Sequence, residues 1–388
     1  MKYFEFFNPV KICAGDDALR HLNYELDSLN IKKPLLLSDD GLQKLGLVKK
    51  MIKLSNLKNY ILYTDIPTDS GVQVVNNILK IFTQNNCDGI IALGGGSVID
   101  TAKGVKMLYA RTNDLKQVMG LDVVSKSFDL PFIVLPTTSG TGSETTPVAV
   151  IKDEESSVKM EFITPYLMPN VAIIDPRLTQ TLPPKITAST GFDALVHAIE
   201  AYTCLQKNPL SDAYALTAIK LIFDNISLVC TEPNNLEART NMALASTLAG
   251  LAFGNSMVGG VHAIGHALGG VCHIAHGDAM TILLPHVMEY NKSHMQDVYS
   301  QLAQNIFSEK CIGLSKSEMV ELLIDYIKDV QHDLFILTEI PITLTRTGKY
   351  DKVKAEEVAT NALNDGAMIV NPVAMDKNDI LEILKNAE

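Results

Sequence analysis

Positive charge is scarce in this sequence. Its 388 residues include 33 Lys and Arg against 44 Asp and Glu, which gives a formal net charge of −11. Nucleic-acid binding needs a cationic face that neutralises phosphates. The short basic pairs at 32–33 and 49–50 do not supply one. We therefore expect no nucleic-acid partner.

Paired cysteine motifs and a secretion signal are also absent. The six cysteines are scattered without a Cys-x-x-Cys spacing, which in a long chain favours free thiols in a reducing compartment over a disulfide framework. The first residues, Met1-Lys2-Tyr3-Phe4-Glu5, lack the basic, apolar and small-residue regions of a signal peptide. We expect a cytoplasmic protein.

One long stretch contains no charged side chain. No Asp, Glu, Lys or Arg lies between Arg239 and Asp278, a length that would permit a membrane span. The stretch holds Asn255 and histidines such as His262, however, and ionisable residues are rare inside a bilayer. We interpret it as the buried core of a soluble protein and expect no membrane partner.

Apolar residues make up 47% of the chain, enough for a large core. The first half alternates short aliphatic runs with amphipathic helices, and several runs are continuously apolar, as in strands covered on both faces. This alternation predicts an α/β domain with a doubly wound, Rossmann-like parallel sheet. The strand candidates are residues 34–39, 59–66, 89–93, 131–135, 148–151 and 171–175.

The pattern changes near residue 180. Beyond Pro183-Pro184 the chain is rich in Ala, Leu and Ile at helical spacing, except in the poorly patterned segment 330–350. We predict an α/β dinucleotide-binding domain over residues 1–180 and an all-helical, metal-binding catalytic domain over 181–388. The main helix candidates are residues 187–203, 210–228, 236–253, 258–268 and 316–329.

Three glycines end one buried strand and open a helix. The run Ile90–Leu93 leads into Gly94-Gly95-Gly96-Ser97 and then into a helical pattern. Glycine lets the backbone approach a ligand, and a helix N-terminus offers free N–H groups to an anion such as a pyrophosphate. The spacing is neither Gly-x-Gly-x-x-Gly nor a Walker loop, so a tight turn without a ligand is the alternative.

Two further features lie where predicted strands end. The loop 136–146 is rich in hydroxyls and glycines, and open α/β sheets bind ligands at the carboxyl ends of their strands. Asp39 ends the first buried strand, where an acid can accept hydrogen bonds from a ribose diol and repel a 2′-phosphate. The alternative is that Asp39 only starts the turn before Gly41 and binds no ligand.

Acid and imidazole side chains recur at helical spacing in apolar surroundings. Residues four apart lie on one helix face, and polar groups on an apolar face need partners, which a divalent cation would provide. One carboxylate with three neutral imidazoles suits Fe²⁺ or Zn²⁺, whereas Ca²⁺ and Mg²⁺ prefer oxygen ligands. Spacing alone does not choose four ligands among the six candidates. These are Asp193, His197, His262, His266, His273 and His276.

As a set, these motifs resemble the iron-containing (group III) alcohol dehydrogenases, from about residue 5 to the C-terminus. The likeness rests on four segments in the family's order: 94–103, which includes Asp100 and Lys103, then 136–144, 191–200 and 262–277. The chain departs from the family at Pro67-Thr68-Asp69-Ser70, where many members have an Asn that touches the cofactor. His273 and Asp278 also replace an aromatic or neutral residue and an aliphatic one.

The resemblance implies an Fe²⁺ site, with Zn²⁺ possible, formed by Asp193, His197, His262 and His276. It places His266 beside the nicotinamide as the catalytic residue. It gives Asp39 the part of the ribose-selecting acid found in NAD-preferring members. The residues that it assigns to NAD(H) binding are Asp39, Gly95, Gly96, Ser97, Thr137, Thr138, Thr146, Lys159, Leu178 and His266.

The implied reaction is reversible hydride transfer between a primary alcohol, or its aldehyde, and NAD(H), in a homodimer or larger homo-oligomer. Phe253 is either a wall of the alcohol pocket or ordinary helix core. A glycerol or polyol dehydrogenase is the nearest alternative. A dehydroquinate-synthase-like lyase would need basic residues near the metal motif, and none lies between 240 and 291. A non-enzymatic metal-binding module would leave the glycine turn unexplained.

Overall fold

The structure is a computed structural model that describes residues 3–110, 114–121, 130–155 and 158–388. The chain forms two compact units. The sheet unit comprises Phe7–Leu182 and Asn234–Gly250, and the helical unit comprises Met1–Phe6, Pro183–Pro233 and Leu251–Glu388. Helix α8 (Leu236–Phe253) crosses the division, so residues 234–250 belong with the sheet rather than with the helices that follow them. The domain limits 1–180 and 181–388 stay a prediction.

The sheet unit is built on a six-stranded parallel sheet in the order β1-β9-β6-β4-β2-β3. This confirms the predicted doubly wound fold. The chain runs outward from β2 to β3, then returns to β4 and continues in the other direction, so the strand order reverses between β2 and β4. The strands are β1 (Lys11–Ala14), β2 (Pro34–Leu37), β3 (Ile61–Tyr63), β4 (Gly89–Gly94), β6 (Phe132–Pro136) and β9 (Val171–Ile174).

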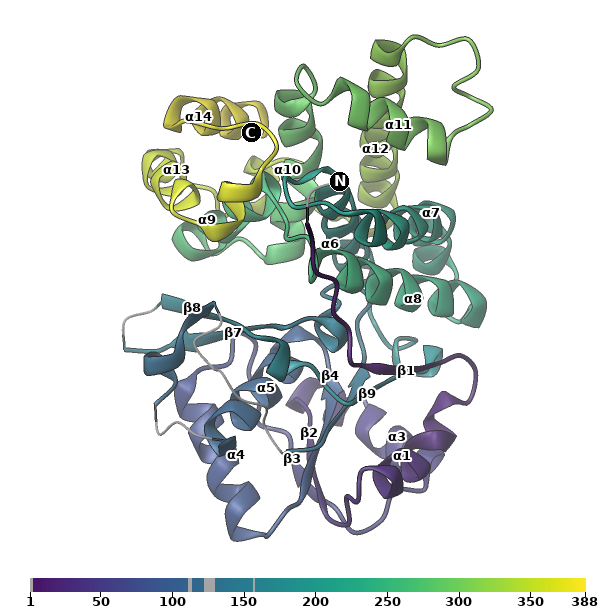
Figure 1. The fold of residues 1–388 in the computed structure, drawn as a ribbon, viewed down its shortest axis with the longest axis vertical. Coiled ribbons are helices and arrows are strands. Elements are labelled where there is room, and N and C mark those ends of the chain that lie inside the picture. Colours follow the sequence, from purple (N-terminus) through teal and green to yellow (C-terminus); the bar gives the residue numbers. More distant parts are fainter. Residues whose placement is uncertain (1–2, 111–113, 122–129, 156–157) are drawn as a thin grey trace. The chain divides into compact units, whose positions relative to one another are not determined.

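Successive side chains of the central strands enter two different cores, because side chains alternate across a strand. Leu35 and Ile90 pack with helices α4 (Val72–Gln84) and α5 (Gly96–Ala110). Leu36 and Ile91 pack with α1 (Leu22–Ser28) and α3 (Leu47–Ser55). The helices therefore cover both faces of the sheet (Figure 1). Burial on both faces explains why β2 and β4 are apolar throughout.

A second, three-stranded sheet in the order β5-β8-β7 was not predicted. Its strands are β5 (Gly120–Leu121), β7 (Val148–Asp153) and β8 (Val158–Ile163). The predicted strand 148–151 exists, but it pairs antiparallel with β8 instead of joining the parallel sheet. Burial alternates along β7, as expected of a strand with only one buried face.

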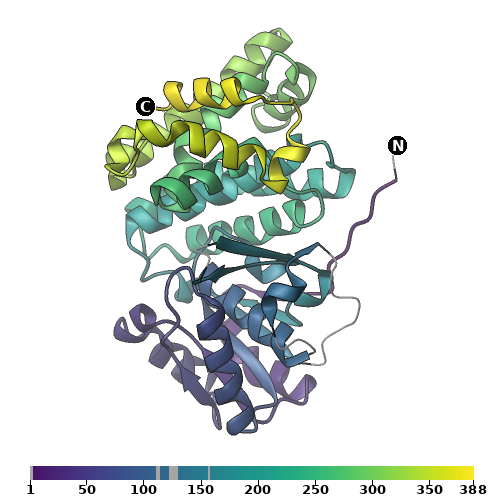
Figure 2. The same ribbon diagram turned by 90° about the vertical axis from the view of Figure 1, so that its left-hand side faces the viewer.

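In the helical unit the described residues form helices and no strand. Proline begins α6, and a capping box of Asn208 and Ser211 begins α7. The α12 helix extends to Thr338, beyond the predicted end at residue 329. Helices α13 and α14 lie side by side at the C-terminal end (Figure 2). Besides α8, the helices are α6 (Pro184–Thr203), α7 (Pro209–Thr231), α9 (Gly260–Cys272), α10 (His276–Asn291), α11 (Gln296–Ile306), α12 (Lys316–Thr338), α13 (Ala355–Leu363) and α14 (Lys377–Asn386).

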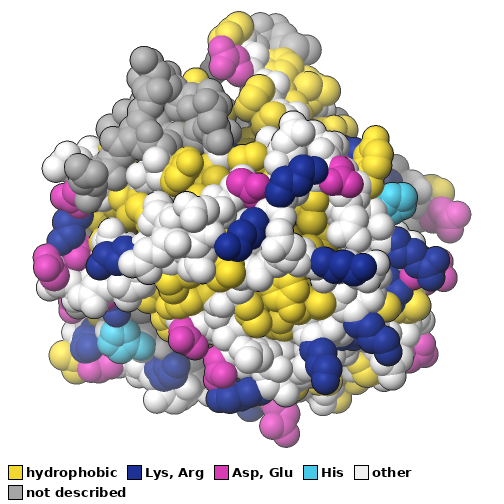
Figure 3. All heavy atoms as spheres, turned by 90° about the horizontal axis from the view of Figure 1, so that it is seen from below, with side chains coloured by type: hydrophobic (Ala, Val, Ile, Leu, Met, Phe, Trp, Pro, Cys, Tyr) yellow, Lys and Arg dark blue, Asp and Glu magenta, His cyan; other side chains and the backbone are white. Residues whose placement is uncertain are grey.

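The cysteines, the long apolar helices and the surface charges bear on the expectations drawn from composition. All six cysteines are free, as predicted. Within the described ranges, one helix, α7, is long and apolar enough to cross a membrane by length and composition alone, a test that core helices of soluble proteins also pass. On the part of the molecular face drawn in Figure 3 that is described, Lys and Arg side chains are interspersed with acidic and apolar ones and form no single basic patch.

Candidate metal centre and cofactor site

Helix α6 carries an acid and an imidazole on one buried face. Asp193 and His197 are one turn apart, and their side chains are 3% and 8% exposed. The apolar residues around them remove both side chains from water. Polar groups buried in this way are stable only with partners.

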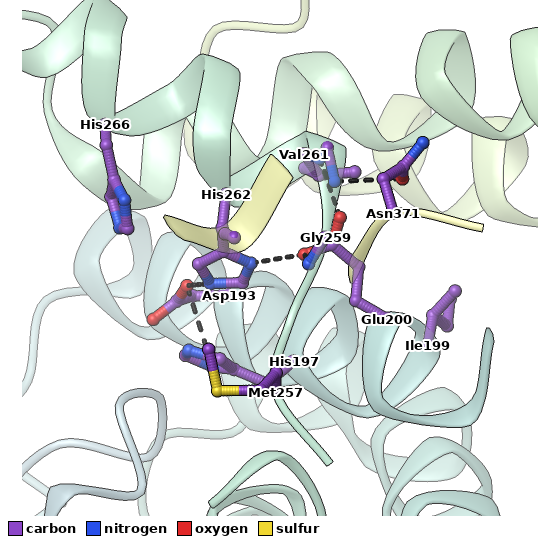
Figure 4. A network of polar contacts seen from close by, with 12 residues as sticks. Asp193, His197, Ile199, Glu200, Met257, Gly259, Val261, His262, His266 and Asn371 are labelled. Carbon is purple, nitrogen blue, oxygen red and sulfur yellow. Dashed lines mark hydrogen bonds and ion pairs between the residues drawn. The ribbon is translucent and has the colours of Figure 1, made fainter. Parts of the chain in front are cut away.

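Two other helices bring imidazoles to the same acid. His262 lies in the first turn of α9, and His276 is the first residue of α10. The Oδ1 atom of Asp193 lies 3.8 Å from His197 Nδ1, 3.8 Å from His262 Nε2 and 3.2 Å from His276 Nε2. Figure 4 shows Asp193, His197 and His262 turned toward one another. We call Asp193, His197, His262 and His276 the acid–imidazole cluster.

Several atoms of the acid–imidazole cluster lack a hydrogen bond. Asp193 Oδ1, His197 Nδ1 and His262 Nε2 are buried, and none has a hydrogen-bond partner among the described residues. An unpartnered buried polar atom costs about 1–3 kcal/mol. A divalent cation would provide the missing partner: Asp193, His262 and His276 present ligand atoms within 4.8 Å of one another, and His197 adjoins this group with its Nδ1 atom 3.8 Å from Asp193 Oδ1. The donor set of one carboxylate and three imidazoles fits Fe²⁺ or Zn²⁺.

Protonation states in the cluster also suit a cation. Burial lowers the pKa of His197 to about 3, and burial holds the pKa of His262 well below its ordinary value. Both rings are therefore neutral near pH 7 and offer lone pairs. Burial alone would raise the pKa of Asp193, but the neighbouring imidazoles, which include the more exposed His276, outweigh burial and lower that pKa.

Among the described residues, the cluster reaches the surface at His276. The His276 side chain is 41% exposed, whereas those of the other three members are at most 8% exposed. His266, predicted to be catalytic, lies one turn after His262, and its ring centroid is 5.5 Å from that of His276. Its Nδ1 atom lies 2.9 Å from Asp365 Oδ2, so a carboxylate orients the ring. His266 therefore lies beside the open side of the cluster.

Phe253, His273 and Asp278 differ in their surroundings. The Phe253 ring stacks on His197, with centroids 4.2 Å apart and planes 13° apart, so it lies against a predicted ligand rather than in unrelated core. His273 ends α9 in a left-handed conformation and is exposed. Asp278 lies half-buried in the first turn of α10, where burial raises its pKa.

Three residues that were not predicted, Glu200, Asp365 and Asn371, also belong to this site. Glu200 accepts hydrogen bonds from two backbone N–H groups and approaches His262, and Asn371 accepts one from Gly260. Glu200 could have been found, because it follows His197 by three residues in the same buried stripe. Nothing in the local pattern around Asp365 or Asn371 marked them.

In the sheet unit, predicted cofactor residues meet where the strand order reverses. Asp39 follows β2, and the glycine turn follows β4, its neighbour. Open α/β sheets bind ligands at this kind of position. Asp39 also caps the short helix α2 (Asp40–Lys44), because its Oδ1 accepts the Leu42 N–H at 2.8 Å. The structure thus shows the capping role of Asp39, and its contact with a ribose stays a prediction.

The glycine turn and the hydroxyl-rich loop lie against each other. The Thr137 N–H donates to Gly94 O at 3.1 Å. A Cβ atom on Gly95 would lie 3.0 Å from the Thr138 side chain, and one on Gly96 would lie 3.0 Å from Thr141. A side chain at either position would be crowded, and the partly exposed backbone of Gly95 and Gly96 suits a close approach by a phosphate.

A buried lysine joins the helix after the glycine turn to this loop. Lys103 is fully buried, and its Nζ atom donates to Ser143 Oγ at 2.9 Å, to Thr146 O at 3.0 Å and to Val148 O at 2.6 Å. Ser143 Oγ in turn donates to Asp100 Oδ1 at 2.8 Å. We call Asp100, Lys103, Ser143 and Thr146 the Lys103 cluster. It places Thr146 in a structural network.

The last two predicted cofactor residues differ in their surroundings. Lys159 forms an exposed ion pair of 2.7 Å with Asp69, whose N–H lies 3.4 Å from Ser97 Oγ, so Lys159 is near the glycine turn. Leu178 is fully buried in the core beneath β9. The assignment of both to cofactor binding stays a prediction.

Family models and known proteins match this chain over its length. The model "Iron-containing alcohol dehydrogenase" matches residues 9–176, and "Fe-containing alcohol dehydrogenase family, C-terminal" matches residues 187–388. The chain is 34% identical to the NAD-dependent methanol dehydrogenase of Bacillus methanolicus (98% of this chain, 99% of the relative). It is 33% identical to the 1,3-propanediol dehydrogenase of Citrobacter freundii (100% and 99%).

Solved structures give the same picture. A 1,3-propanediol oxidoreductase superposes with a TM-score of 0.94 at 33% identity, covering 100% of both chains. The sulfoacetaldehyde reductase of Bifidobacterium kashiwanohense, solved in complex with NAD⁺, superposes with a TM-score of 0.88 at 26% identity, covering 100% of this chain and 99% of its own.

Proposed function

Because the chain belongs to the iron-containing alcohol dehydrogenase family and is thus a metal-dependent alcohol dehydrogenase, we propose the following assignment of its parts. The enzyme transfers hydride reversibly between a primary alcohol and NAD(H). The acid–imidazole cluster holds Fe²⁺, with Zn²⁺ as the competing ion, since zinc binds most such sites more tightly than ferrous iron.

One observation carries the metal assignment. Buried atoms of Asp193, His197 and His262 converge without hydrogen-bond partners among the described residues, on a cluster that His276 opens to the surface. A cation held there supplies Lewis acidity, which lowers the pKa of an alcohol hydroxyl. The exposed side of the cluster, between His276 and His266, is where an alcohol would enter.

The residues of this chain have distinct parts in the reaction. His266, held through Nδ1 by Asp365, accepts the hydroxyl proton and passes it to solvent. Phe253 fixes the plane of the His197 ring by stacking on it. The glycine turn and the hydroxyl-rich loop bind the pyrophosphate, and Asp39 receives the ribose hydroxyls and disfavours a 2′-phosphate.

Two classes of alcohol are candidates for the substrate. Relatives named for methanol and for 1,3-propanediol match this chain almost equally, at 34% and 33% identity. The propanediol relatives make a polyol dehydrogenase the second candidate. A simple primary alcohol is our first choice.

The test is a nicotinamide absorbance assay on protein reconstituted with Fe²⁺ or Zn²⁺. The substrates are methanol, ethanol, butanol, 1,2-propanediol, 1,3-propanediol and glycerol. We expect NAD⁺ reduction with primary alcohols and loss of the activity after chelation. Glycerol as the best substrate by kcat/KM would favour the polyol assignment, and activity that survives complete removal of metal would contradict the metal assignment.

We further propose that this soluble enzyme works in the cytoplasm as a homodimer or larger homo-oligomer. The free cysteines support a reducing compartment. Light scattering on the purified protein would measure the oligomeric state.

A further inference from the structure

Glu200 lies directly behind one of the proposed metal ligands. Its Oε2 atom accepts the Gly259 N–H at 2.9 Å and lies 2.6 Å from His262 Nδ1, while Oε1 accepts the Val261 N–H at 2.7 Å (Figure 4). The Glu200 and His262 side chains are 6% and 3% exposed. The buried carboxylate therefore contacts two backbone N–H groups and the Nδ1 atom of His262.

The position of Glu200 on α6 relates it to two other members of the acid–imidazole cluster. Asp193, His197 and Glu200 follow one another at steps of four and three residues, so they share one face of the helix. The first two side chains point into the cluster, and the third reaches across to α9. One helix thus supplies two ligands and holds a third from another helix.

The start of α9 has no cap of its own. Gly259 is the N-cap residue and has no side chain to accept the first free N–H groups. Glu200 accepts the N–H groups of Gly259 and Val261, and Asn371 accepts that of Gly260 at 3.0 Å. Burial raises the pKa of Glu200, and the N–H groups at this helix N-terminus, where negative charge is favourable, offset part of that rise.

The contact with His262 has a chemical consequence. Glu200 already accepts a backbone N–H at each carboxylate oxygen, so the short contact is satisfied when His262 Nδ1 carries the hydrogen and donates it. The lone pair then lies on Nε2, the atom 3.8 Å from Asp193 Oδ1 that has no partner among the described residues. We propose that Glu200 is a positioning residue that fixes the ring orientation and the Nδ1–H tautomer of His262 for metal binding. This inference rests on the proposed metal site.

The matched pair of variants is Glu200→Gln and Asn371→Ala. Glutamine keeps the size of Glu200 but presents an NH₂ group either to Val261 N–H or to Gly259 N–H and His262 Nδ1. Asn371→Ala removes an acceptor from the same helical turn without touching His262. A role confined to capping α9 predicts similar effects of the two variants on metal binding, whereas the positioning role predicts different ones.

The measurement is the dissociation constant for Zn²⁺, from competition with a chelator. We expect Glu200→Gln to bind Zn²⁺ about 10–100-fold more weakly than the unmodified protein, the usual effect of losing a partner that orients a ligand. Asn371→Ala should stay within about threefold, although its unfolding temperature falls. Equal affinity of Glu200→Gln and the unmodified protein, or equal weakening by both variants, would overturn the inference.

A second measurement needs no variant of Glu200 and no metal. Nitrogen-15 NMR of the unmodified, metal-free protein reports which imidazole nitrogen carries the hydrogen, and the His262 signal is assigned by its absence in His262→Gln. We expect hydrogen on Nδ1. Hydrogen on Nε2 alone, so that Nδ1 accepts a hydrogen bond from a protonated Glu200, would overturn the inference. If the unmodified protein binds no divalent cation, the proposed metal site is refuted. The position of the hydrogen on His262, as measured by NMR, would not be affected by that outcome.

Discussion

The Lys103 cluster of the sheet unit and the acid–imidazole cluster of the helical unit both place charged side chains away from water, but they differ in how those charges are satisfied. Lys103 donates to Ser143, Thr146 and Val148, and Asp100 accepts from Ser143 and from the Val150 N–H. In the other cluster, Asp193 Oδ1 and His262 Nε2 face each other at 3.8 Å without hydrogen bonds among the described residues.

This difference separates structure from function. A buried polar group that its own chain satisfies contributes to folding, since its loss leaves the partners unpaired. A convergent set that its own chain leaves unsatisfied indicates a ligand from outside, because the folded protein would otherwise retain the cost of desolvation. The first three experiments below test this contrast, and the fourth tests the predicted cofactor contact of Asp39 in the sheet unit.

The largest effect is expected from Asp193→Ala. Without the carboxylate, bound metal and turnover should be lost together, and kcat/KM should fall by a factor on the order of 1000 or more, because several kcal/mol of charge stabilisation disappear. Elemental analysis and the absorbance assay measure the two losses. His286→Ala, on α10 but outside the cluster, is the control and should retain metal, in contrast to His276→Ala. Full turnover by metal-free Asp193→Ala would show that the acid–imidazole cluster does not need an ion for its function.

Lys103→Met should mainly affect folding. Removing Lys103 leaves buried acceptors and the Asp100 charge uncompensated, so we expect the free energy of unfolding to fall by about 3–5 kcal/mol in urea titrations. Lys106 lies on the same helix, is also buried and donates to Met168 O at 3.0 Å. Lys106→Met is the matched control, with a loss of about 1–3 kcal/mol. Equal losses would show that Asp100 adds nothing to the cluster.

The same lysine predicts a pH dependence. Burial lowers the pKa of Lys103 from 10.5 to about 8, so between these values the unfolded chain binds more protons than the folded chain. Stability from this group therefore rises as pH increases from 8 toward 10.5, by about 3 kcal/mol in total, since one pKa unit is about 1.4 kcal/mol. Urea unfolding at pH 8 and pH 10 should show a larger difference between the unmodified protein and Lys103→Met at the higher pH. A constant difference would mean that Lys103 keeps an ordinary pKa.

The smallest effect is expected from Asp39→Ser. Serine still caps α2, so the unfolding temperature should hardly change, while the charge that repels a 2′-phosphate is removed. The ratio of kcat/KM for NADP⁺ to that for NAD⁺ should rise about tenfold, equivalent to about 1.4 kcal/mol. Asp40→Ser, which changes the exposed neighbouring acid, should leave this ratio unaltered. An unchanged ratio in Asp39→Ser would reduce Asp39 to a helix cap.

Much of the fold could be predicted from the sequence, because parallel strands buried on both faces are continuous apolar runs such as Ile90–Leu93. The small second sheet could not, since the alternating burial of β7 depends on which strand it pairs with. Residues 234–250 could not be assigned to the sheet unit either, because Gly250 packs closely on Gly142 and sequence patterns do not report such a distant contact.

The candidate site, like the fold, could be predicted only in part. Helical spacing paired Asp193 with His197 and His262 with His266, but only the resemblance chose four ligands among six candidates. The structure brings those four together. Asp365 and Asn371 lie about one hundred residues from the groups that they contact, at a separation over which no local pattern operates.

The acid–imidazole cluster joins α6 to α9 and α10, two consecutive helices that come much later in the chain. An ion held by all three would act as a removable crosslink, and by mass action it would stabilise the folded helical unit as well as serve catalysis. Protein made during iron shortage would then unfold more readily and be degraded faster, so the supply of the ion would set how much enzyme persists as well as how fast each molecule works.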